Sequence, residues 1–262
     1  MKTTAIPAAT LLGIRFHCVT MVQVYERICE FLRTKIPHQV CLSNAYTVSV
    51  CWKDAELRAS LDQADLVLAD GMSIVWGGRL IGVNIPCRIA GPDLAEYICE
   101  QAARAGHRIF FLGSTPENLA QLNREVLRRW PNLQIAGLYS PPMCDKLSAE
   151  DNAIVFNILE AAKPDILFVG MSMPKQEKWI ASNRTHLKVP VAIGIGAAFD
   201  FLSGRVKRAP KAFQMAGMEW LYRLWCEPRR LWKRYFLGNF IFLSHLGVAW
   251  LRFTFLKRHT SS

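Results

Sequence analysis

The residues most able to do chemistry follow short apolar runs of this sequence. Asp70 comes directly after the run "DLVLA" at 65–69 and precedes Gly71. A carboxylate at the end of a buried strand can lie at the floor of a crevice, where partial burial raises its pKa and makes it a better proton acceptor. Aspartate is also a preferred helix N-cap, and the tetrapeptide taken alone favours that structural role. Asp70 is therefore a candidate general base with a capping alternative.

Polar residues and glycine follow two other apolar runs in the same way. Asn44 and Thr47 follow "QVCLS" at 39–43, and Gly113 ends "RIFFLG" at 108–113. Pro116 suits the first turn of a helix after Gly113, and the exposed amides of a helix N-terminus can bind phosphate. This segment is a weak phosphate signal by itself, because well-capped helices are common and the glycine-rich dinucleotide fingerprint is absent.

Three further motifs contain candidate binding residues. Gln176 lies just after Pro174, so it is expected in the first turn of a helix, where its amide could bind sugar hydroxyls or a developing oxyanion. A solvated surface glutamine is the alternative. Asp200 could accept hydrogen bonds from a base or ribose, or cap a helix. Arg88 could bind the carboxylate of a uronic acid, or pair with Asp93 as part of the structure.

These residues need a scaffold that brings them together, and the apolar runs predict one. The runs at 39–43, 65–69, 108–113, 133–139, 165–170 and 191–196 are short and rich in Val, Ile, Leu or Phe, as in buried strands. Helical spacing is found between them, at 53–64, 93–105, 117–130, 149–162 and 175–187. This alternation predicts a Rossmann-like α/β fold, with a mostly parallel sheet and helices on both faces. The carboxyl ends of its strands would form one edge, where ligands bind.

The positive charge of the chain is concentrated in its tail. The net charge is +11, and twelve lysines and arginines lie between Arg205 and the end against two acidic residues. We therefore predict a catalytic α/β domain at 1–204 and a basic, aromatic-rich helical appendage at 205–262. Such a tail could meet nucleic acid, an anionic membrane or a phosphorylated substrate. No nucleic-acid-binding motif is found, so no nucleic-acid partner is expected.

The tail also contains an apolar segment without charged side chains, at 235–251. It is near the lower length limit for a membrane span, and it contains Asn239 and His245. An interfacial helix in the headgroup region fits better than a span, and docking on the protein's own body is the alternative.

The appendage carries arginines at spacings that suit an anion. Arg230 and Arg234 are four residues apart, as are Arg229 and Lys233, so each pair would lie on one helix face. Paired arginines offer forked donors to a diphosphate. A solvated basic face is the alternative, but like charges at this spacing repel, which favours a bound anion.

Eight cysteines are present without any C-x-x-C pair, and most lie in apolar segments. They are expected to be buried, reduced thiols of a cytosolic protein.

Together and in order, the motifs resemble those of the WecG/TagA/CpsF glycosyltransferases. The similarity extends from about Val40 to Phe236. It rests on seven segments, namely "SNAYTV", "ADLVLADGMSIVW", "RIAGPDL", "FFLGSTPE", "GMSMPKQEKWI", "GIGAAFDFLSGRVKRAP" and "GMEWLYRLWCEPRRLWKRY".

The resemblance implies an activity and a location. The activity is transfer of a hexose, an N-acetylhexosamine or its uronic acid from a UDP-sugar to a sugar on polyprenyl diphosphate. The transfer would invert the anomeric carbon, form a β bond and need neither metal nor cofactor, in the synthesis of bacterial cell-surface or exopolysaccharide. The enzyme would be cytoplasmic and peripherally attached to the anionic inner face of the plasma membrane. A homo-oligomer stays open.

The resemblance also assigns roles by motif match. Asp70 becomes the proposed base, Thr47 and Gln176 match polar active-site positions, and Asn44 lies beside them. Asp200 matches a position on the nucleotide side. The residues expected to hold the diphosphate are found among Arg223, Arg229, Arg230 and Arg234. The remaining predicted substrate-binding residues are Gly113, Arg88, Asp93 and Arg208.

Two other classes of protein stay open. A nucleotide-dependent oxidoreductase with a similar fold is disfavoured, because the G-x-G-x-x-G fingerprint is absent. The chain could also be a non-catalytic nucleotide-binding accessory subunit of a membrane glycosyltransferase.

Overall fold

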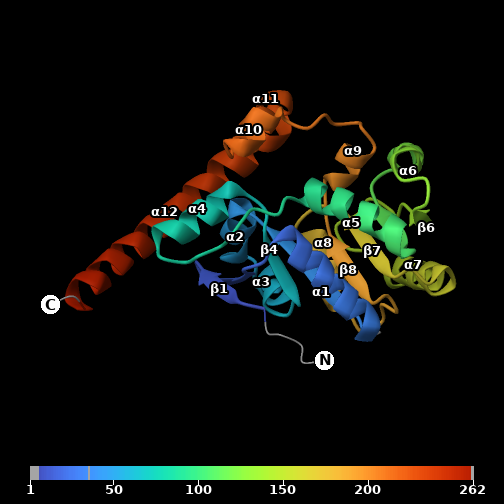
Figure 1. The fold of residues 1–262 in the computed structure, drawn as a ribbon, viewed down its shortest axis with the longest axis horizontal. Helices are drawn as coiled ribbons and strands as arrows, with labels where there is room; N and C mark the ends of the chain where they lie inside the picture. Colours follow the sequence, from blue (N-terminus) through green and yellow to red (C-terminus); the bar gives the residue numbers. More distant parts are fainter. Residues whose placement is uncertain (1–5, 35, 261–262) are drawn as a thin grey trace.

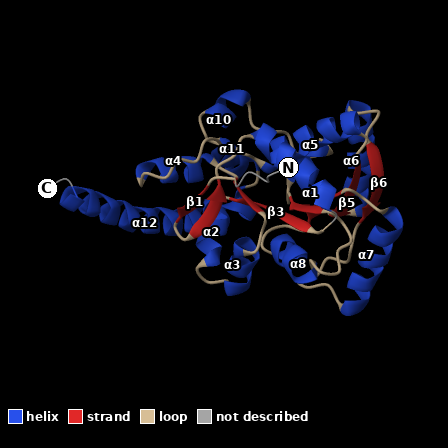
Figure 2. Ribbon diagram, turned by 60° about the horizontal axis from the view of Figure 1, so that its bottom comes forward, coloured by secondary structure: helices blue, strands red, loops and turns tan. Residues whose placement is uncertain are grey.

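A parallel sheet of six strands forms the centre of the molecule in the computed structural model (Figures 1 and 2). The structure describes residues 6–34 and 36–260, except for the side chains at 230, 233, 234 and 256–260. The strand order is β4-β3-β8-β7-β5-β6. Because all paired strands of this sheet are parallel, consecutive strands are connected by crossovers. The strands are β3 (His38–Ser43), β4 (Leu66–Ala69), β5 (Arg108–Gly113), β6 (Gln134–Tyr139), β7 (Ile166–Gly170) and β8 (Val191–Gly194). Each corresponds to one of the six apolar runs, and the predicted fold class is confirmed.

Helices cover both faces of the sheet, because alternate strand residues are apolar on both sides. Phe111 and Phe168 belong to the core on one face, and Phe110 and Leu167 to the core on the other. The first face is covered by α1 (Met21–Thr34), α5 (Gly91–Ala105), α6 (Pro116–Arg129) and α9 (Ala198–Leu202). The second is covered by α2 (Ala45–Cys51), α3 (Ala55–Asp62), α4 (Met72–Leu80), α7 (Ala149–Ala162) and α8 (Lys175–Asn183). Helices therefore leave the carboxyl edge toward opposite faces, which is the arrangement that opens a ligand crevice.

A small antiparallel hairpin precedes the sheet. It consists of β1 (Ala8–Leu11) and β2 (Ile14–His17), with Ala9 opposite Phe16. It packs on the β4 side of the core, where the His17 Nδ1 accepts a hydrogen bond of 3.0 Å from the backbone N–H of Val67. This hairpin and helices α1, α2 and α4 are additions to the predicted elements.

The tail is helical, as predicted. It consists of α10 (Lys211–Met215), α11 (Glu219–Cys226) and α12 (Pro228–Thr260). In Figure 1, α12 runs beside α2 and α4 and extends beyond the body. Phe242 and Leu246 on α12 are buried, and the Ser49 hydroxyl in α2 donates a hydrogen bond of 2.7 Å to the carbonyl of Gly238. One side of α12 is thus docked on the body.

The other side of α12 is apolar and exposed. Its exposed large side chains include Phe236, Leu237, Phe240, Leu243, Leu251 and Phe255. Among the described residues, one helix segment is long and apolar enough to cross a membrane, Tyr235–Phe255. Docking and an exposed apolar surface therefore coexist on one helix. The division of the chain between residues 204 and 205 stays a prediction.

Candidate active site

Asp70 and Asn44 lie side by side at the carboxyl edge of the sheet. Ser43 and Ala69 are paired in the ladder between β3 and β4, and each strand ends there. The next residues are Asn44 and Asp70, and the backbone N–H of Asp70 donates a hydrogen bond of 2.9 Å to the carbonyl of Ser43. A Cβ added to Gly71 would lie 3.6 Å from the Cβ of Asn44. Two residues that are distant in sequence are therefore neighbours.

The capping alternative for Asp70 is wrong. Helix α4 begins at Met72, and its N-cap is Gly71, with no hydrogen bond from a capping side chain. Gly71 has a φ of 147°, a backbone conformation that L-residues with side chains rarely adopt, so this position needs glycine. The half-buried Asp70 is placed at the carboxyl edge of the sheet, directly after β4, and precedes the N-cap Gly71.

Asn44 and Thr47 have a structural role at the start of α2. The Oδ1 of Asn44 accepts hydrogen bonds from the backbone N–H of Thr47 at 3.1 Å and from its hydroxyl at 3.3 Å. Together they form a capping box. Thr47 is only 1% exposed, so this hydroxyl holds the loop that carries Asn44.

Gln176 lies in the first turn of α8, as predicted, but it is not a solvated surface residue. It is 4% exposed, and its side chain lies against the backbone that follows β8. A Cβ added to Gly194 would come within 3.0 Å of its Nε2. The end of β8 therefore packs against this amide.

Asp200 is linked to the segment that follows β5. Its Oδ1 accepts a hydrogen bond of 3.0 Å from the Nδ2 of Asn118, which also donates to the Ser114 hydroxyl at 2.8 Å. Asp200 lies inside the short helix α9, whose N-cap Ala197 has no side-chain capping bond, so Asp200 does not cap it. Gly113 has a φ of 117°, and an added Cβ would be 2.6 Å from the carbonyl oxygen of Gly170. The edge of β5 is thus closely packed against β7.

A ring of four charged side chains joins the body to the appendage. The Arg88 guanidinium lies 2.9 Å from Glu219 and 3.4 Å from Asp93. Arg208 lies 2.7 Å from Asp93 and 3.1 Å from Glu219. Both alternatives for Arg88 were open in the sequence, and the structure pairs it with Asp93 and additionally with Glu219. We call these four residues the charge ring.

The other predicted arginines lie elsewhere on the appendage. Arg223 was expected among the residues that hold the diphosphate; its guanidinium lies over the ring of Phe201, 5.3 Å from the centroid, and its Nε is buried. Arg229 is exposed at the start of α12. The side chains of Arg230 and Arg234 lie outside the described part of the structure.

The appendage packs next to the helix that follows Asp70. A Cβ added to Gly217, between α10 and α11, would lie 2.6 Å from the Trp76 side chain and 2.8 Å from the Cβ of Met72. Farther along, a Cβ added to Gly238 would lie 2.6 Å from the ring of Tyr46, one residue into α2. The basic tail and the carboxyl edge of the sheet therefore meet at the same end of the molecule.

Comparison with known proteins identifies the family of this chain. The family model described as "Glycosyl transferase WecG/TagA/CpsF family" matches residues 9–255. The chain belongs to this family. It is 36% identical over 177 residues to a Bacillus spizizenii N-acetylglucosaminyldiphosphoundecaprenol N-acetyl-beta-D-mannosaminyltransferase, covering 68% of this chain and 66% of that protein. A Staphylococcus aureus protein with the same name is 29% identical over 224 residues, covering 84% of this chain and 85% of that protein. The predicted family and the predicted class of enzyme, a glycosyltransferase, are confirmed.

Three residues of this family member were missed as site components by the sequence. Asn118 holds Asp200, Glu219 completes the charge ring, and Glu177 contacts Gln176. Asn118 and Glu219 are far in sequence from their partners, so no local pattern indicates the contacts. Glu177 is adjacent to Gln176, but only the structure shows that it is buried.

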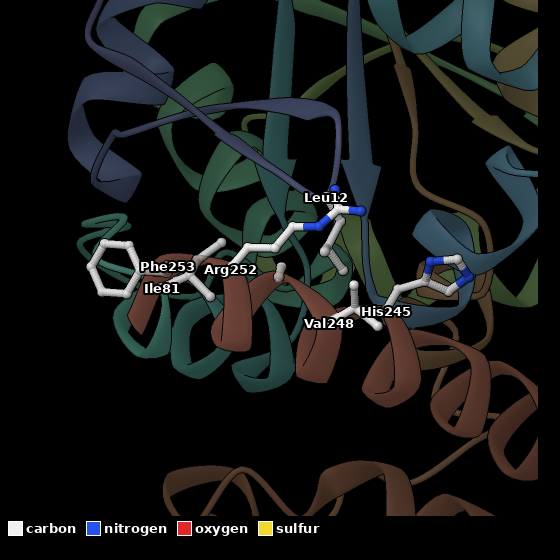
Figure 3. Close-up of a pocket in the computed structure, with 7 residues that line it drawn as sticks. Leu12, Ile81, His245, Val248, Arg252 and Phe253 are labelled. Carbon is white, nitrogen blue, oxygen red and sulfur yellow. The ribbon is translucent and has the colours of Figure 1, made fainter. Parts of the chain in front are cut away.

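A groove beside α12 lies away from these residues. Its volume is about 490 Å³, and it is lined by Leu12, Ile81, His245, Val248, Ala249, Arg252 and Phe253. Figure 3 shows the Arg252 side chain extending toward Leu12 in the hairpin turn. None of the predicted site residues lines this groove, so the groove and the polar residues at the carboxyl edge of the sheet belong to different parts of the surface.

The described residues contain no group of three or more His, Cys, Asp or Glu side chains that could hold a metal ion. Independence of metal stays a prediction.

Proposed function

We propose that this glycosyltransferase moves a sugar from a UDP-sugar to a sugar on a polyprenyl diphosphate, in the synthesis of a cell-envelope polysaccharide. The names of the two relatives support an N-acetylhexosamine as the transferred group and a diphospho-polyprenyl sugar as the acceptor. The observation that carries the proposal is the placement of Asp70. Its half-buried carboxylate lies at the carboxyl edge beside Asn44, and it does not cap a helix.

In the proposed reaction, Asp70 accepts the proton of the attacking acceptor hydroxyl. The oxygen of that hydroxyl forms a bond to the anomeric carbon from the face opposite the nucleotide. The bond between the anomeric carbon and the diphosphate breaks, and UDP leaves with the electron pair. Attack from the opposite face inverts the anomeric carbon.

The departing diphosphate needs positive charge or hydrogen-bond donors nearby. The appendage supplies cations, among them the exposed Arg229. Asp200, oriented by Asn118, is the proposed contact to the nucleoside. No metal or cofactor takes part in this scheme.

The exposed apolar side of α12 supports attachment to a membrane. It combines large apolar side chains with the basic tail, which suits an anionic lipid surface. We place the enzyme in the cytoplasm, on the inner face of the plasma membrane, where the diphosphate of a lipid carrier is within reach of the crevice.

The test is sugar transfer by the purified full-length protein. A panel of UDP-sugars is assayed with a short-chain polyprenyl-diphosphate acceptor, for the wild type, Asp70→Asn and the control Asp62→Asn. Asp62 is an exposed partner of Arg58 at the end of α3, which precedes β4, whereas Asp70 follows β4. Removal of a general base should lower kcat by about 10²–10⁴-fold, and the control should keep its activity.

A folded Asp70→Asn variant with near-normal kcat would remove the base assignment. Transfer that appears only after another protein chain is added would instead favour an accessory role.

A further inference from the structure

The side-chain amide of Gln176 has only one possible orientation in its surroundings. Its Nε2 donates a hydrogen bond of 2.8 Å to the Oε1 of Glu177, and both side chains are buried, at 4% and 1% exposure. A carboxylate has only acceptor atoms, so the amide must present its N–H group. The reverse orientation would place two oxygens against each other.

The environment keeps Glu177 in place. Its backbone carbonyl accepts a hydrogen bond of 2.9 Å from the Nε2 of Gln39, which is fully buried in β3. Glu177 is thus hydrogen-bonded to Gln39 and to Gln176, and it links α8 to β3. The amide of Gln176 is additionally confined by Gly194 and Gly196. A Cβ added to Gly194 would lie 3.0 Å from its Nε2, and a Cβ added to Gly196 would lie 3.5 Å from its Oε1.

The fixed orientation leaves the Oε1 of Gln176 as the atom that needs a partner. It is buried, and no hydrogen bond to it is found in the described part of the chain. Buried acceptors in folded proteins are normally paired with a protein group, a water or a ligand. This oxygen lies at the carboxyl edge, nearest to the backbone that follows β8.

We propose that Glu177 is a positioning residue that turns the carbonyl oxygen of Gln176 toward the bound sugar. Gln176 then accepts a hydrogen bond from a hydroxyl or an amide N–H of that sugar. This inference rests on the proposed function and sharpens it, because the group at this point must be a hydrogen-bond donor. It also assigns the Oε1 of Gln176 as an acceptor, and only the second N–H of its Nε2 is then left as a donor to a developing oxyanion.

The experiment uses sugar analogues that lose one donor at a time. In one arm, each hydroxyl of the UDP-sugar is replaced by fluorine, which cannot donate; in the other arm, the same is done on the acceptor sugar. An N-acetyl group is replaced by an O-acetyl ester. A loss of kcat/KM with an analogue of the UDP-sugar would show that the donor sugar contacts Gln176. A loss with an analogue of the acceptor would show that the acceptor sugar does.

For the wild type, one analogue should lose about tenfold or more in kcat/KM. In Gln176→Leu, that same analogue should react as well as the unmodified sugar, because the acceptor atom is gone. In Glu177→Gln, the new amide can donate a hydrogen bond to the Oε1 of Gln176, so the amide of Gln176 can also adopt the reverse orientation. The loss in kcat/KM for that analogue should then be smaller than in the wild type. The control Glu160→Gln changes an exposed pair with Lys188 and should leave the penalty unchanged.

An equal analogue penalty in the wild type and in Gln176→Leu would overturn the acceptor role. An unchanged penalty in a folded Glu177→Gln would overturn the positioning role. Should Glu177→Gln fail to fold, the wild type and Gln176→Leu still decide the acceptor role. If the wild type transfers no sugar from any UDP-sugar, the proposed function fails instead.

Discussion

The guanidinium of Arg208 lies between two carboxylates, 2.7 Å from Asp93 and 3.1 Å from Glu219. Arg88 contacts the same two acids from the other side, so the four residues close the charge ring. Asp93 is in the first turn of α5, and Glu219 begins α11. The ring therefore holds the start of the appendage against the body.

Glu219→Gln tests this link. Two arginines would lose a charged acceptor in a site where the Glu219 side chain is 14% exposed. The free energy of unfolding should fall by about 1–3 kcal/mol, measured by urea denaturation. Trypsin should also cleave the basic segment at 205–211 faster than in the wild type.

The control is Glu100→Gln, which breaks the exposed pair with Arg104. Exposed pairs contribute little, so its stability should stay within about 0.5 kcal/mol of the wild type. Equal stability and equal cleavage rates for both variants would show that the charge ring does not fasten the appendage.

Asn118→Ala tests the orientation of Asp200. The variant removes the amide that donates to Asp200 at 3.0 Å. The Asp200 carboxylate should then lose its fixed direction, and the Kd for UDP should rise by about fivefold to tenfold, measured by calorimetry. Asn157→Ala, on the exposed side of α7, is the matched control. Unchanged UDP binding in the Asn118 variant would separate Asp200 from the nucleotide.

Two phenylalanines on α12 distinguish docking from lipid contact. Phe242 is 1% exposed and faces the body, whereas Phe240 is 69% exposed. Phe242→Ala should lower stability by about 3–5 kcal/mol through loss of packing. Phe240→Ser should leave stability nearly unchanged and weaken binding to vesicles with anionic lipids, measured by co-sedimentation. Full vesicle binding by a folded Phe240→Ser variant would argue against this side of α12 as the lipid contact.

His17 makes stability dependent on pH. Burial, and secondarily the charge of Arg15, lower the pKa of His17 from 6.5 to about 4. The unfolded chain therefore binds this proton at a higher pH than the folded chain. The contribution of His17 should be complete above pH 6.5 and be lost as the pH falls toward 4, by about 3 kcal/mol.

The measurement is urea denaturation of the wild type and His17→Gln between pH 7.5 and 4. Glutamine keeps an acceptor for the Val67 N–H but does not titrate in this range. The free energy of unfolding of the wild type should fall relative to that of His17→Gln as the pH is lowered from 6.5 to 4. A constant difference in the free energy of unfolding across the range would contradict the lowered pKa of His17.

The sequence located the strands well because each is a short run of apolar residues with polar residues at its end. It was less informative at the N-terminal hairpin, where each strand has four residues. Helix α2 has seven residues and is held by the capping box of Asn44 and Thr47, which a helical spacing does not reveal in so short a segment.

The sequence by itself determined the order of strands and helices, the basic tail and the family, since these depend on local patterns and on ordered motifs. Only the tertiary structure decided that Gly71, not Asp70, is the N-cap of α4, and that Glu177 accepts a hydrogen bond from the amide of Gln176. It also decided that Arg88 and Arg208 share two acids, Asp93 and Glu219. Such contacts join residues from different elements, and the packing of the sheet and its helices sets their distances.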